Sequence, residues 1–126
     1  MNKLDKFNYD ALIAAVQLLA MPCKLQVEAL PSFVSVPDEV ALIFDDAYKA
    51  ARHVVESLDA NKNAINLLND LDSALDRMSE NSELWSLQAL DTDSEWGKCR
   101  LLAKDILESL NEPFVSPKLE FIQFVK

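Results

Sequence analysis

The chain has 126 residues, of which half are hydrophobic and 26% are charged, and its net charge is −9 at pH 7. This balance belongs to a folded domain and excludes an intrinsically disordered chain. The single glycine, Gly97, argues against a β-sandwich or barrel, because tight turns between strands usually need several glycines. We therefore expect one all-α domain over residues 1–126, a compact antiparallel bundle of about four to six helices with an extended or short-helical C-terminal tail.

The acidic residues are concentrated in the middle of the sequence. Residues 38–95 hold fourteen acids and four bases, for −10, whereas residues 1–37 sum to zero and residues 96–126 sum to +1. Nucleic acids and anionic membranes bind cationic surfaces, so neither is expected as a partner. A basic protein is the partner that this charge fits.

The first helix is predicted over residues 9–20, where apolar residues recur at helical spacing and Asn8 can serve as the N-cap. Prolines punctuate the connector that follows. Within this connector, residues 24–30 fit a short helix and residues 32–36 an extended segment.

Neither the N-terminal region nor the cysteines indicate export. The apolar stretch 11–21 is too short to span a bilayer, and Asp5 and Asp10 stand where a secretion signal would be basic. Cys23 and Cys99 are too few for a disulfide framework and fit small buried hydrophobes in a reducing compartment. A cytoplasmic protein is therefore expected.

The clearest periodic stretch predicts a long helix over residues 37–58. Pro37 suits its first turn, and Asp38 and Glu39 suit the positive end of the helix dipole. Residues 62–78 predict the next helix, whose apolar residues alternate in steps of three and four. The short connection between these helices favours antiparallel packing.

Residues 82–90 predict one further short helix. For the last long helix, Thr92 and Glu95 fit a capping box, Asp93 and Ser94 are alternative caps, and Pro113 follows the end. Gly97 near its start costs about 1 kcal/mol relative to alanine. Either another backbone or Trp85 approaches this glycine closely, or the glycine is merely tolerated.

The tail over residues 113–126 is too apolar to remain in water. A last short helix, a strand over the bundle and docking on a second copy all remain open, although a monomer is favoured over a homodimer. The apolar residues concerned are Leu119, Phe121, Ile122, Phe124 and Val125.

Residues for catalysis or cofactor binding do not assemble into a motif. His53 is the only histidine, and Glu56 is its only obvious companion for a metal. No serine lies in a nucleophile elbow, one glycine cannot build a phosphate-binding loop, and no Glu-x-x-His pair is present. We therefore expect no enzyme, no cofactor and no metal.

The acids instead form a pattern that can bind a partner. Asp72 and Asp76 lie one helical turn apart, and an aromatic anchor surrounded by acids is a common binding design. One of Trp85 and Trp96 is expected in the core. The simpler alternative is that the acids only keep the protein in solution. The candidate partner-binding residues are Asp45, Asp46, Asp72, Asp76, Glu80, Glu83, Trp85, Asp91 and Asp93.

One region resembles a known group of proteins. It consists of Leu84-Trp85-Ser86-Leu87-Gln88-Ala89-Leu90, a short acidic turn, and Trp96-x-x-x-Arg100-x-x-Ala103-x-x-Ile106-Leu107. This region is similar to helical immunity proteins of bacterial toxin–immunity systems, including contact-dependent inhibition. The resemblance implies binding to a cognate toxin domain, often a basic nuclease, whose active site or substrate groove is blocked. It implies no catalytic residue, because such proteins act by occupancy.

Two alternatives belong to other classes. A small acidic secretion chaperone or adaptor shares the size and charge, but such chaperones usually contain a sheet and dimerise. The second alternative is an enzyme. In that case, substitution of His53 or of a cysteine should abolish its activity.

Overall fold

A computed structural model describes residues 1–58, 62–120 and 122, and all regular structure in this part of the chain is helical. In chain order it forms α1 (Lys3–Ala20), α2 (Cys23–Ala29), α3 (Val36–Glu56), α4 (Lys62–Met78), the 3-10 turn η1 (Ser82–Trp85), α5 (Leu87–Thr92) and α6 (Ser94–Ser109). The predicted all-α fold is confirmed. None of these helices is both long enough and apolar enough to cross a bilayer.

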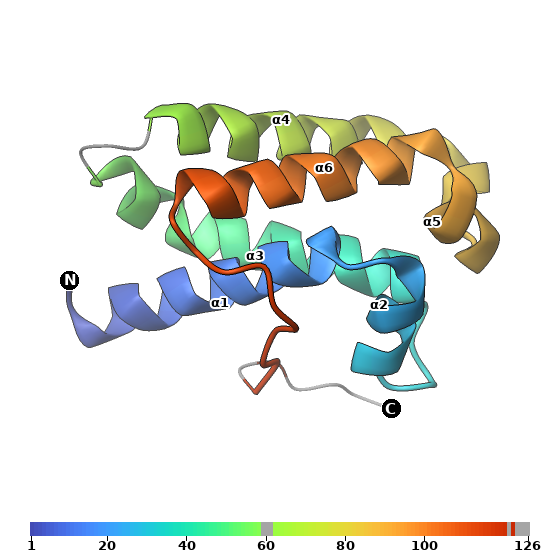
Figure 1. Cartoon of the computed structure of the whole chain (residues 1–126), viewed down its shortest axis with the longest axis horizontal. Helices are drawn as coiled ribbons and strands as arrows, with labels where there is room; N and C mark the ends of the chain where they lie inside the picture. Colours follow the sequence, from blue (N-terminus) through green and yellow to red (C-terminus); the bar gives the residue numbers. More distant parts are fainter. Residues whose placement is uncertain (59–61, 121, 123–126) are drawn as a thin grey trace.

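The four long helices form an up-and-down bundle. Helix α1 packs against α3 and α6, and α4 closes the ring because it also packs against α3 and α6 (Figure 1). Each long helix runs antiparallel to the one before it (Figure 1). The short elements α2, η1 and α5 lie together at one end of the bundle, where α2 contacts both α3 and α5.

Helix α1 is the central helix, since every residue from Ala11 to Ala20 is buried. It begins at Lys3 instead of residue 9, so the predicted start and the predicted cap Asn8 are wrong. Asn2 is the N-cap, and its side chain accepts a 2.7 Å hydrogen bond from the backbone N–H of Asp5. The first two turns extend beyond the core with exposed side chains, so they lack the apolar periodicity used to place the helix.

Helices α3 and α4 follow their predicted stripes. The buried residues of α3 include Val40, Phe44 and Ala51, and those of α4 include Leu68 and Leu71. The connector before α3 differs from the prediction. Residues 32–34 form a turn, in which the backbone N–H of Val34 donates to the Pro31 carbonyl, instead of an extended segment.

The predicted helix over residues 82–90 is divided into η1 and α5. Ser86 separates them, since its extended backbone ends η1 and its hydroxyl accepts a hydrogen bond from the N–H of Ala89 to cap α5. The capping box at Thr92 is also wrong, because Thr92 belongs to α5. The alternative cap Asp93 begins α6 and accepts a 2.8 Å bond from the N–H of Glu95.

Gly97 is tolerated rather than required. No atom lies within 4 Å of the position that a Cβ atom would take there, so of the two alternatives the tolerated glycine is confirmed and the close approach of a backbone or of Trp85 is wrong.

The tail is fixed to α1 where it begins. The Tyr9 hydroxyl donates to Glu112, and the Gln17 side-chain amide donates to the Pro113 carbonyl, both at 3.0 Å. The described tail residues 113–120 and 122 form neither a helix nor a strand, although Leu119 and Ile122 pack against the core. The predictions on Phe121, Phe124 and Val125 lie outside the described residues.

Candidate functional site

A groove of about 600 Å³ runs between α3 and α4. We call it the α3–α4 groove. Buried Phe44 lies at its base, and η1 contributes Ser82 and Trp85. Besides Phe44, the lining residues of α3 are Asp38, Ala41, Leu42, Asp45 and Lys49, those of α4 are Asp72, Leu75 and Asp76, and Ser79 follows the end of α4.

Helical spacing explains why these side chains share one groove. Apart from Phe44, the lining positions on α3 recur three, four, seven and eleven residues after Asp38, and on α4 they recur three and four residues after Asp72. Residues at these offsets lie on one side of a helix. On each helix, therefore, the apolar stripe packs into the core and the neighbouring surface faces the groove.

Negative charge dominates the groove. Four aspartates and one lysine line it, for a sum of −3. The pKa of Asp72 is raised by burial, and the nearby carboxylates of Asp45 and Asp76 raise it further, while Lys49 and Arg52 oppose the shift. Asp72 thus lies where like charges converge, and a further cation would stabilise its ionised form.

One cation of the protein already lies in the groove. The Lys49 ammonium is 2.7 Å from a carboxylate oxygen of Asp45, one helical turn away on α3. Both side chains keep much of their exposure. Such exposed ion pairs are weak and exchange readily with other partners.

Trp85 forms the aromatic end of the groove. Its indole N–H donates to the Met78 carbonyl at 2.9 Å, and its ring meets that of Trp96 edge-to-face at 5.3 Å. Trp96 is 1% exposed and donates to the Leu84 carbonyl. The expectation that one tryptophan belongs to the core is confirmed for Trp96, whereas Trp85 is only partly buried and borders the groove.

Four of the nine candidate binding residues come together in the groove, namely Asp45, Asp72, Asp76 and Trp85. The other five lie outside its lining. Asp46, Glu80, Glu83 and Asp91 are exposed, and Asp93 is occupied as the cap of α6.

Asp38, Leu42 and Lys49 are among the groove residues that sequence reasoning missed. The sequence predicts for Asp38 only an interaction with the helix dipole, and it predicts no binding role for Leu42 or Lys49. Leu42 is 51% exposed, so it is an apolar residue outside the core stripe. The signal that could have found all three is their spacing of four and seven residues from one another along α3.

The remaining reactive groups are held in structural roles. The imidazole of His53 lies 3.2 Å from the Asp5 carboxylate, and Glu56, its expected metal companion, is paired with Arg52 instead. Burial raises the pKa of the Cys99 thiol to about 11, and burial also raises the pKa of Cys23. Both thiols are therefore protonated at neutral pH.

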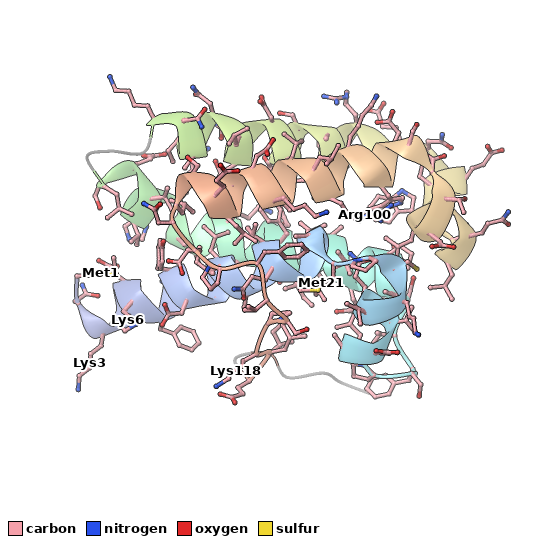
Figure 2. The ribbon with its side chains drawn as sticks, in the orientation of Figure 1. Met1, Lys3, Lys6, Met21, Arg100 and Lys118 are labelled. Atoms are coloured by element: carbon pink, nitrogen blue, oxygen red, sulfur yellow. The ribbon has the colours of Figure 1, made fainter. Side chains whose placement is uncertain are left out.

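The basic residues of the first helix and the tail lie away from α4. Figure 2 shows Lys3 and Lys6 on α1 and Lys118 on the tail, along the edge of the molecule opposite α4. These lysines thus lie apart from α4, and Lys6 is paired with the Asp10 carboxylate at 3.0 Å.

No protein-family model matches the chain, and its comparison with curated proteins and with solved structures gives no match. The inference of function therefore depends on the geometry and charge of the α3–α4 groove.

Proposed function

We propose that the protein is an immunity protein of a bacterial toxin–immunity system. It binds a cognate toxin domain, most simply a basic nuclease, through its acidic surface, and it neutralises the toxin by occupancy without catalysis. In this proposal the protein is a cytoplasmic monomer that needs no cofactor.

The convergence of Asp45, Asp72 and Asp76 beside Trp85 is the observation that carries the proposal. Like charges held close together weaken the fold slightly. Their presence in one partly apolar groove therefore indicates a binding function that offsets this cost in stability. A basic partner supplies that compensation. Its cations relieve the repulsion, and its apolar groups cover Leu42 and Trp85.

Occupancy explains how binding would inhibit a nuclease. Such an enzyme holds its polyanionic substrate with lysine and arginine side chains. A row of carboxylates can engage the same cations, so the substrate groove of the toxin is filled by protein instead of nucleic acid. The long-range attraction between the two surfaces also accelerates their association.

The test is to express this protein with the toxin encoded by the gene directly preceding its own. We expect growth to be restored and a direct complex to form, with association that slows as salt rises. Neutralising Asp72, Asp76, Glu80 and Glu83 together should slow association by about tenfold or more at low salt.

Other functions give different results in this experiment. A secretion chaperone would hold its partner without protecting the cell, and an enzyme would show an activity that depends on His53 or a cysteine. Complex formation without growth protection would contradict the immunity proposal. Association rates that do not respond to salt or to the four substitutions would contradict the acidic surface as its site.

A further inference from the structure

The α3–α4 groove has the length, lining and charge to receive a helix. We propose that it binds an amphipathic α-helix of the partner, which places an apolar stripe against the groove's base and arginine or lysine side chains against both walls. This inference rests on the proposed function, since it specifies which element of the partner enters the site.

The dimensions of the groove fit a short helix. Its lining on α3 extends from Asp38 to Lys49, which is about 16 Å at 1.5 Å per residue, or about three helical turns. A third helix commonly packs against two neighbouring helices, and helix-in-groove binding uses anchors at i, i+3 or i+4, and i+7. The groove is open to solvent, so a helix can enter it from outside.

The groove is lined by apolar groups as well as by charged ones. Leu42 and Trp85 border it, and Ala41, Leu75 and the buried ring of Phe44 form its base. A fully hydrated polyamine or basic loop would leave Leu42 and the exposed parts of Ala41 and Trp85 in water. A helix with an apolar stripe covers them, and this burial supplies affinity that does not depend on salt.

The carboxylates lie on both sides of this apolar strip. Asp38 and Asp45 belong to the α3 wall, and Asp72 and Asp76 belong to the α4 wall. Because Asp72 and Asp76 are one turn apart, they match two cations that are one turn apart on a bound helix. Cations on both flanks of an apolar stripe are therefore the pattern that this groove selects.

Lys49 acts as an internal substitute for one of these cations. In the free protein its ammonium is paired with the Asp45 carboxylate. On binding, a cation of the partner would replace Lys49 at this carboxylate. Substitutions of the two partners of this ion pair therefore have opposite effects. Removing the Asp45 charge weakens binding, whereas removing the Lys49 charge strengthens it.

The inference can be tested with a synthetic peptide and the intact protein. The probe is an end-capped helical peptide of about 15 residues, with leucines at i, i+4 and i+7 and arginines on both flanks. A scrambled peptide of equal composition and charge serves as its control. Calorimetric titration at low and at physiological salt should give a dissociation constant at least tenfold lower for the amphipathic peptide.

The matched variants separate the groove from the general acidity of the protein. Asp72→Asn with Asp76→Asn should weaken binding about tenfold. The control pair Glu80→Gln with Glu83→Gln removes the same charge outside the lining and should weaken binding less than threefold. Lys49→Gln should strengthen binding at least twofold, and Asp45→Asn should weaken it.

Equal binding of the two peptides would overturn the inference, and so would equal losses from the two charge-matched pairs. Because the titration contains no toxin, its outcome is independent of growth protection. Selective peptide binding without protection would overturn the proposed function alone. Protection by a protein that does not distinguish the peptides would overturn the helix inference alone.

Discussion

Asp72 is the residue at which the electrostatics of the groove converge. Its pKa is raised chiefly by burial and then by Asp45 and Asp76. In the folded protein its neutral form is therefore favoured relative to the unfolded chain. The stability associated with this group is present below the ordinary carboxyl pKa of about 3.9, and it is lost as pH rises through the raised value.

Replacing Asp72 with asparagine should accordingly stabilise the protein at neutral pH. A like-charge pair one turn apart costs about 0.2–0.5 kcal/mol, which corresponds to a rise of about 1–2 °C in Tm for a domain of this size. Thermal unfolding at pH 7 and pH 3 measures the effect, which should vanish at pH 3. Asp70→Asn, an exposed change on the same helix, is the control. A lower Tm for Asp72→Asn at pH 7 would show that Lys49 and Arg52 outweigh the repulsion.

Gly97 gives a second prediction for a single residue. It lies in the first turns of α6 with open space around its Cβ position and no positive φ. Gly97→Ala should therefore stabilise the protein by about 1 kcal/mol through helix propensity and reduced freedom of the unfolded chain. Denaturant unfolding measures this gain. A loss of stability would reveal a close contact at this position.

At the scale of helices, α2 is joined to α1 through one buried side chain. Gln26 is 0% exposed, and its amide nitrogen lies 3.0 Å from the Leu18 carbonyl and 3.5 Å from the Leu19 carbonyl. These carbonyls belong to the last turn of α1, and the Leu18 carbonyl also accepts a 3.2 Å bond from the backbone N–H of Met21. A polar residue of the short helix thus completes the end of the central one.

Gln26→Glu should be strongly destabilising at pH 7, because it would place a buried carboxylate against two carbonyl oxygens. We expect a loss of about 3 kcal/mol or more, compared with about 1–2 kcal/mol for the uncharged control Gln26→Met. Burial would raise the pKa of the introduced carboxyl group, so its stability should recover as pH falls. Unfolding in denaturant at pH 7 and pH 5 tests this. A loss that is equal at both pH values would contradict the assigned hydrogen bonds.

The limits of sequence reasoning are visible in particular elements. The long amphipathic helices could be predicted, because their buried residues recur with helical periodicity. The first turns of α1 could not, since residues that project beyond the core carry no such periodicity. The division between η1 and α5 depends on one local hydrogen bond to the Ser86 hydroxyl, and serine fits a helix as well as a cap in sequence alone.

At the scale of the whole molecule, the sequence located the acidic region but not its shape. Charge counting treated residues from Asp45 to Asp93 as one surface. The packing of α3 against α4 selects some of these acids and leaves others, such as Glu80 and Glu83, outside the groove. It also adds Asp38 and Leu42, whose contribution depends on which side of α3 faces α4. That information lies in helix packing and not in composition.

The proposed binding site is tested most directly by comparing amide NMR spectra of the 15N-labelled protein with and without the toxin domain proposed as its partner. We predict that the largest chemical-shift changes fall in residues 38–49 and 72–85, which contain both walls and the aromatic end of the α3–α4 groove. Changes confined to α1 and the tail, with the groove resonances unmoved, would contradict the account.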